Sequence, residues 1–174
     1  MFHFDFYKKK YIYIFFSFLA AFLSSHLSLD SAAYQSIFNY YGSSGWTRVI
    51  SEVGSYEAFF VITAKLLNGF SSFFWFLIIS LISVSLKIYT IEKSSRNFYI
   101  SFVFYLAYFF VLLDGTQIRV SLAIAIAYLG LYLLSEKKII KSLVLNLLSA
   151  LFFHYSLVFI LAMYVFKNKK TIVF

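Results

Sequence analysis

The sequence predicts an all-α fold, a polytopic membrane helix bundle of about six membrane segments with the N-terminus and the C-terminus both cytoplasmic. Apolar residues make up 62% of the 174 residues and charged residues only 13%, whereas a soluble domain is about half apolar and about a quarter charged. Apolar stretches recur along the chain, and lysines and arginines gather between alternate stretches. A chain this short has too little interior to bury so much apolar surface, so a soluble globule is excluded. Intrinsic disorder is excluded as well, because disordered segments have low hydrophobicity.

The membrane segments are assigned from length and hydropathy. A spanning helix needs about 20 mostly apolar residues. Lysines precede the first stretch in the manner of a signal peptide, but further apolar stretches follow, so we expect an uncleaved anchor. The first four candidate segments are residues 11–29, 70–89, 98–113 and 118–134.

Charge alternates along the connections between these segments. The 30–69 connection has a net charge of −1 and the 114–119 turn is neutral, whereas the remaining connections and the tails are positive. The positive-inside rule places the positive parts in the cytoplasm and the 30–69 connection, the 114–119 turn and His154 outside. Cations beside the anionic leaflet account for the net charge of +8 without nucleic acid as a partner. The positive parts are residues 1–10, 87–96, 136–141 and 167–170.

Residues 139–166 form an apolar stretch interrupted only by Lys141, Asn146 and His154. As one helix this stretch would be about 42 Å long, and it would carry the lysines after it to the outer side, against the charge rule. We therefore expect a pair of short helical segments that breaks close to His154 and is either thin or partly re-entrant. Such irregular backbone is tolerated only where protein or a wet cavity covers it.

We expect one membrane domain over residues 1–174, with residues 30–69 as its extracytoplasmic connection. Glycines divide this connection into two expected interfacial helices, at 31–40, which Asp30 would cap, and at 53–67. Its aromatic and acidic side chains suit a carbohydrate, and they suit equally an interfacial aromatic belt without a ligand. An apolar run restarts at 171–174, so the chain is expected to be the N-terminal part of a longer protein.

Several chemistries find no support in the sequence. Cysteine is absent, which excludes thiolate nucleophiles, disulfides and zinc–sulfur sites. His3, His26 and His154 are scattered without metal-ligand spacing, and no glycine-rich phosphate loop occurs. We therefore expect neither a metal nor another cofactor.

Arg119 is the first candidate for a functional residue. Arg119, Ala123, Ala127 and Gly130 share one helix face, and this narrow face lets a neighbouring helix approach closely. A guanidinium at a helix start suits bidentate phosphate binding, because the helix dipole also favours anions there. An ion pair with Asp114, or snorkelling to the interface, explains Arg119 equally well.

Three further residues are candidates for proton transfer. His154 can exchange a proton near neutral pH, although a lone histidine in a turn more often bonds a neighbour or water. Asp30 and Glu57 lie in the outward connection, where capping and solvation explain them equally well.

Four fragments occur in this order along the chain: Asp30 with Tyr34, residues 56–59, residues 117–123 and residues 153–156. Together they resemble the EpsG family of multi-spanning proteins, which is related to O-antigen and exopolysaccharide polymerases of the Wzy type. The resemblance covers about residues 28–166 of the printed sequence, and the element that opens with Gln117 together with the downstream Phe-His-x-Ser is its most specific part. Two positions depart from the family pattern, Ala58 where proline is frequent and Val120 where glutamine is frequent. Family members are longer, so the resemblance implies that this chain is the N-terminal half.

The resemblance implies a polymerase of polyprenyl-diphosphate-linked oligosaccharides in the bacterial cytoplasmic membrane. A hydroxyl of one repeat unit would attack the anomeric carbon of another, and the lipid diphosphate would leave. Arg119 would stabilise that leaving group, and Asp30, Glu57 or His154 would take the hydroxyl proton. The residues expected to bind substrate are Arg119, Gln117, Tyr34 and Tyr56.

Three other functions remain open at this stage. A flippase or transporter of lipid-linked glycans would share the outward aromatic surface, but it needs a polar path through the bilayer. A membrane-bound acyltransferase would need His154 to face its acyl donor, against the expected orientation. A non-catalytic assembly protein, working with other polysaccharide export or assembly proteins, needs no active site.

Overall fold

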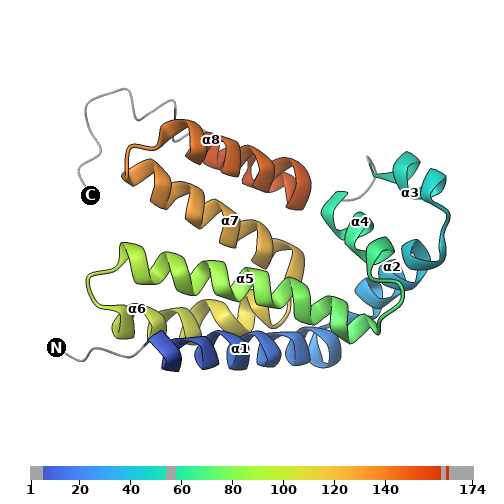
Figure 1. Ribbon diagram of the computed structural model, residues 1–174, viewed down its shortest axis with the longest axis horizontal. Helices are drawn as coiled ribbons and strands as arrows, with labels where there is room; N and C mark the ends of the chain where they lie inside the picture. Colours follow the sequence, from blue (N-terminus) through green and yellow to red (C-terminus); the bar gives the residue numbers. More distant parts are fainter. Residues whose placement is uncertain (1–5, 54–57, 162–163, 165–174) are drawn as a thin grey trace.

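The computed structural model describes residues 6–53, 58–161 and 164, and within them the chain is helical without a strand, which confirms the expected all-α fold (Figure 1). The π-helical segments η1 (Leu23–Leu27), η2 (Tyr105–Asp114) and η3 (Ser149–Phe153) continue α1, α6 and α8, and the 3-10 segment η4 (Tyr155–Leu161) follows η3. The α-helices are α1 (Phe6–Phe22), α2 (Ser31–Ser43), α3 (Trp46–Glu52), α4 (Ala58–Leu66), α5 (Ser72–Ser94), α6 (Phe98–Phe104), α7 (Ile118–Ser135) and α8 (Ile139–Leu148).

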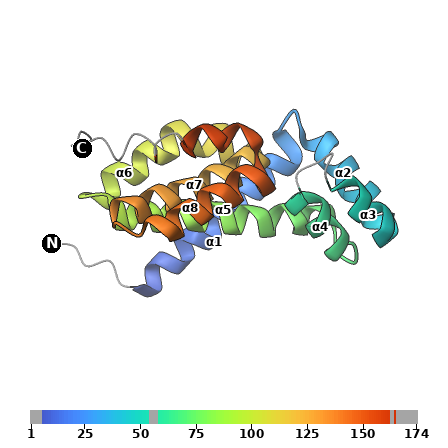
Figure 2. The ribbon, with the colours of Figure 1, turned by 90° about the horizontal axis from the view of Figure 1, so that it is seen from above.

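The longer helices lie side by side along the long axis of the molecule, and α2, α3 and α4 gather at one end (Figures 1 and 2). The closest packing joins α1 to α5, α5 to α7 and α7 to α8. The α5–α6 and α7–α8 connections lie together at the end opposite α2–α4 (Figure 1). The bundle therefore brings two of the basic connections to one end and the long 30–69 connection to the other.

Within the described residues, two helices, α5 and α7, are long and apolar enough to cross a membrane. Residues 11–27 and α2 qualify together as a third crossing, but the chain bends by 95° between them. Residues 98–114 and 139–153 are apolar but shorter. Large apolar side chains are exposed along α1 and η2, such as Phe15, Phe18, Tyr108 and Val111, which is the surface that a bilayer would cover.

The expected helix break at His154 is confirmed. Segment η3 ends at Phe153, and His154 has an extended backbone with φ −164° and ψ 113°. The amide of His154 donates to the carbonyl of Ser149 over 3.0 Å, and η4 begins with the next residue. The 139–161 stretch is therefore a bent pair of helical segments and not one straight helix.

The described residues of the 30–69 connection pack against the start of α5. Tyr34, Phe38 and Tyr41 on α2 are buried in a core that includes Trp75 of α5. The indole nitrogen of Trp75 donates to the hydroxyl of Thr63 on α4 over 3.0 Å. The helix expected at 31–40 extends to Ser43, and α3 was not expected. Helix α4 forms the C-terminal part of the helix expected at 53–67, of which residues 54–57 lie outside the described residues.

The small-residue face predicted on α7 packs against α8 and η3. Ala123, Ala127 and Gly130 are buried, and the Ser149 hydroxyl donates to the carbonyl of Ala123 over 2.7 Å. A Cβ added to Gly130 would lie 2.5 Å from Nδ2 of Asn146. Because Asn146 is itself buried, it has little room to move away.

Substituting Gly130 with valine should destabilise the bundle. Overpacking of this kind costs about 1–3 kcal/mol, and the expected result is a lower temperature of thermal unfolding for the purified protein in detergent. Gly69→Val is the matched control, since nothing lies within 4 Å of a Cβ added there. Equal melting temperatures for the two variants would contradict this packing.

Candidate active site at the start of α7

A tight turn leads from η2 into α7 and determines where α7 begins. The amide of Gly115 donates to the carbonyl of Phe110 and that of Gln117 to Leu113, both over 2.9 Å. A Cβ at Gly115 would lie 2.7 Å from the Val111 carbonyl oxygen, so only glycine fits. The first turn of α7, which carries Arg119, is therefore held in a fixed position.

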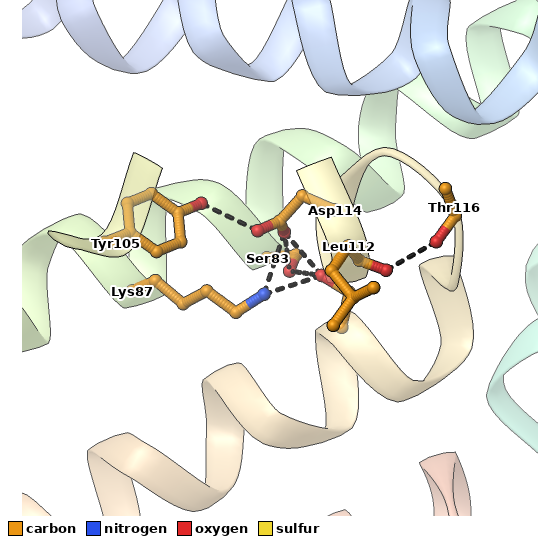
Figure 3. Close-up of polar contacts among 7 residues, drawn as sticks. Ser83, Lys87, Tyr105, Leu112, Asp114 and Thr116 are labelled. Carbon is orange, nitrogen blue, oxygen red and sulfur yellow. Dashed lines mark hydrogen bonds and ion pairs between the residues drawn. The ribbon is translucent and has the colours of Figure 1, made fainter. Parts of the chain in front are cut away.

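A buried network anchors this turn through the carboxylate of Asp114 (Figure 3). Its Oδ1 accepts from Nζ of Lys87 over 2.8 Å and from the Ser83 hydroxyl over 2.9 Å. Its Oδ2 accepts from the Tyr105 hydroxyl over 2.7 Å, and the Ser121 hydroxyl also donates to Oδ1. Lys87 and Asp114 are each only 2% exposed, so their opposite charges neutralise each other inside the bundle.

This network corrects two sequence-based assignments. Lys87 was counted with the cytoplasmic connection, but it lies within α5 and points into the bundle. Asp114 was the alternative partner of Arg119, but the side chains that bond it in the described structure are Lys87, Ser83, Tyr105 and Ser121. Ser83 and Lys87, four residues apart on α5, were the available signal, since that spacing puts them on one helix face.

Arg119 and Tyr34, which were both expected in the substrate site, lie together in the structure. The guanidinium carbon is 5.4 Å from the centroid of the Tyr34 ring, and Nε donates to the Tyr34 hydroxyl over 3.4 Å. Tyr34 is buried in the core of α2, so it provides a fixed aromatic surface for the cation. Residues 85 positions apart in the sequence thus form one contact.

Ser28 joins the start of α2 to the turn before α7. Its hydroxyl donates to the carbonyl of Thr116 over 2.8 Å and accepts from the amide of Asp30 over 3.1 Å. Asp30 stands at the N-cap of α2, as expected, but its side chain makes no capping hydrogen bond. The N-termini of α2 and α7 therefore lie close to each other, and each carries the positive end of a helix dipole.

His154 lies at the same end of the bundle. The hydrogen bond from Ser149 to Ala123 sets the register between η3 and α7. Those two elements run in opposite directions (Figure 1), so one further turn brings His154 to about the level of Arg119. The ring centroid of Phe153, the last residue of η3, is 4.7 Å from that of Phe59 on α4. This ring contact holds the end of η3 against α4.

The remaining sequence-predicted residues differ in their placement. Gln117 is exposed at the N-cap of α7, and its side chain makes no capping hydrogen bond. Tyr56 and Glu57 lie outside the described residues. No group of three or more metal-ligating side chains occurs within the described ranges. The structure therefore brings Arg119 and Tyr34 into contact, and it places Asp30, Gln117 and His154 at the same end of the bundle.

The fold and this contact indicate a class: an all-helical protein with helices long and apolar enough to cross a membrane, and with polar side chains where one of these helices begins. A comparison with protein families then gives the particular family, because the model of the EpsG family matches residues 9–174. The chain belongs to the EpsG family, and membership indicates an exopolysaccharide-polymerase-like role in a membrane. No curated protein and no solved structure matches the chain.

The Lys87→Met variant tests the buried network. It leaves the Asp114 carboxylate buried without its cation, which costs about 3–5 kcal/mol, so thermal unfolding in detergent should shift to clearly lower temperature. Adding Asp114→Asn to the same chain should restore most of the loss, because no charge is then left unpaired. Lys93→Met, at the exposed end of α5, should have little effect, and a loss equal to that of Lys87→Met would disprove the pairing.

Proposed function

We propose that the protein polymerises polyprenyl-diphosphate-linked oligosaccharide repeat units at the outer leaflet of the bacterial cytoplasmic membrane. The observation that carries the proposal is the contact between Arg119 and Tyr34 at the start of α7. The family to which the chain belongs supports the same reading.

The local electrostatics favour an anionic ligand at Arg119. The nearest acidic residue in the sequence, Asp114, pairs with Lys87 and not with Arg119. The guanidinium also lies at a helix N-terminus, where the backbone dipole adds to its attraction for a phosphate group. A planar guanidinium can donate two parallel hydrogen bonds to phosphate oxygens.

The proposed reaction exchanges one glycosidic bond for another. A hydroxyl oxygen of one repeat unit attacks the anomeric carbon of a second unit, and the bond from that carbon to the lipid diphosphate breaks. The bonding electrons leave with the diphosphate, so negative charge grows there in the transition state. Arg119 would stabilise this charge in a site that excludes water.

The proton of the attacking hydroxyl needs an acceptor. Asp30 is the first candidate, because its carboxylate makes no capping bond and Ser28 ties its backbone to the turn before Arg119. His154 and Glu57 are the other candidates. We further propose that Tyr34, Tyr56 and Gln117 contact the substrate beside Arg119.

We also propose the topology of about six membrane segments with both termini in the cytoplasm. The α5–α6 and α7–α8 connections, which carry Arg96 and Lys138, lie at one end of the bundle, and α2–α4 lie at the other (Figure 1). The positive-inside rule puts the basic end in the cytoplasm. Arg119 and the α2–α4 unit then lie toward the outer leaflet, where the lipid-linked units would be coupled.

The role of Arg119 is tested by polymer length in cells that depend on this protein. Arg119→Ala removes a charge-assisted hydrogen bond worth about 1.5–3 kcal/mol, which is about a 10- to 150-fold loss of rate if it acts in the transition state. Arg119→Lys should also impair polymerisation, because lysine keeps the charge but loses the planar donors. Long polymer at normal protein level from Arg119→Ala would refute the proposed site.

The topology is tested by cysteine labelling, since the chain has no native cysteine. A cysteine that replaces Trp46, which is exposed on α3, should react with a membrane-impermeant maleimide from outside the cell. A cysteine that replaces Lys138 should react only after the membrane is opened. The reverse pattern would show that the protein is inserted in the opposite orientation.

A further inference from the structure

A cavity lies where α6 and α7 diverge beside α5. Helix α7 packs against α5 and against η2, the continuation of α6, but it makes little contact with α6 itself. The cavity has a volume of about 230 Å³ and is partly open to the surroundings. The apolar side chains that line this wedge cavity are Ile91, Phe104, Phe109, Leu113 and Ile124.

The surface of the wedge cavity is mainly hydrocarbon, although Lys87 and Tyr105 also line it. The ammonium group of Lys87 donates to Oδ1 of Asp114 over 2.8 Å, and the Tyr105 hydroxyl donates to Oδ2 over 2.7 Å (Figure 3). The polar ends of both side chains are therefore engaged by the buried carboxylate. The methylene stem of a lysine can line an apolar space when its charged end is held elsewhere.

The size and position of the opening indicate part of a single lipid chain. The volume lies below the range of compact small-ligand sites, which is about 300–1,000 Å³. Phe104 and Phe109 line the cavity and are also exposed, so the opening is on the apolar outer surface of the bundle. Because packed structures leave few voids larger than a water molecule, and apolar voids stay dry, a neighbouring lipid chain is the occupant that a bilayer would supply.

The wedge cavity lies next to the basic end of the bundle. Ile91 lies about one turn before the end of α5, and Ser101 lies about one turn after the start of α6. The connection between these helices carries Arg96, which is exposed and has no acidic partner among the described residues. The first turn of α6 adds the positive end of a helix dipole. A cation and a helix N-terminus thus stand beside an apolar cavity.

Two other charged side chains lie near this connection. Glu92 lies toward α1, where it lines a crevice together with Tyr13 and forms a hydrogen bond with it. Lys93 adds a second cation at the end of α5, where its Nζ lies 5.8 Å from the centroid of the Tyr89 ring. An anionic group at Arg96 would therefore meet cations, while the carboxylate of Glu92 is directed to another helix.

We propose that the wedge cavity and Arg96 together bind one anionic phospholipid of the surrounding bilayer. One of its chains would fill the cavity and complete the wall around the Lys87–Asp114 pair, and its phosphate would lie at Arg96. A guanidinium can donate two hydrogen bonds to phosphate oxygens, and basic sites between membrane helices suit anionic headgroups. This site lies toward the end of the bundle opposite α2–α4 (Figure 1), so it does not depend on the proposed reaction.

The test titrates the purified, delipidated protein in detergent with phosphatidylglycerol or phosphatidylethanolamine and follows the bound lipid by native mass spectrometry. One molecule of phosphatidylglycerol should bind more tightly than the zwitterionic lipid and should raise the unfolding temperature. Arg96→Gln should weaken the binding of phosphatidylglycerol about 5-fold and leave that of phosphatidylethanolamine unchanged. Ser101→Trp, which fills the cavity from a partly exposed position, should abolish the binding of both.

Val103→Trp and Lys141→Gln are the matched controls, and both should bind phosphatidylglycerol normally. Val103 is exposed on α6 and is not among the residues that line the cavity, and Lys141 is an exposed cation on α8. Equal losses from Arg96→Gln and Lys141→Gln would indicate a general attraction of charge and would overturn the proposal. It would also be overturned by equal affinity for the two phospholipids, by normal binding to folded Ser101→Trp, or by a polyprenyl phosphate that displaces phosphatidylglycerol. Arg96 lies in an exposed connection, so its variant decides the outcome even where Ser101→Trp fails to fold.

Discussion

The ion pair between Lys87 and Asp114 is the constraint on which the rest of the bundle depends. Both groups are buried in an otherwise apolar chain, and the removal of two charges from water costs several kcal/mol for each ion. Hydrogen bonds from Ser83, Tyr105 and Ser121 offset this cost, because they satisfy the remaining oxygen lone pairs of the carboxylate. These partners come from α5, η2 and α7, so the three elements can pack in only one register.

That register has a direct consequence for Arg119. The turn anchored by Asp114 also starts α7, and Ser28 ties the same turn to the start of α2. Arg119 is thereby held against Tyr34 while the neighbouring carboxylate is bonded to Lys87. Asp114 and Arg119 are only five residues apart in sequence, yet the fold gives them different partners: Asp114 pairs with Lys87, and the guanidinium of Arg119 lies over the Tyr34 ring.

Helix α2 serves two surfaces with different chemistry. Its buried Tyr34, Phe38 and Tyr41 belong to the same core as Trp75, and Tyr34 also contacts Arg119. Its other side carries amides and hydroxyls that no hydrophobic partner covers among the described residues. An aromatic-rich segment that looks uniform in composition is therefore divided by the helical period into a core face and a polar face.

The sequence by itself determined the features that depend on local patterns. Hydrophobic length predicted the positions of α5 and α7, and the charge rule predicted the break at His154. The small-residue spacing predicted the close approach of a neighbouring helix, which the structure shows to be α8 with η3. The family motifs put Arg119 and Tyr34 in one expected substrate site, but their direct contact appears only in the structure. Only the tertiary structure decided that the Lys87 side chain is buried, because its partner Asp114 lies 27 residues away in the sequence. A lysine near the end of an apolar stretch can snorkel to the interface or be buried, and only the carboxylate that packing brings to it determines which of the two occurs.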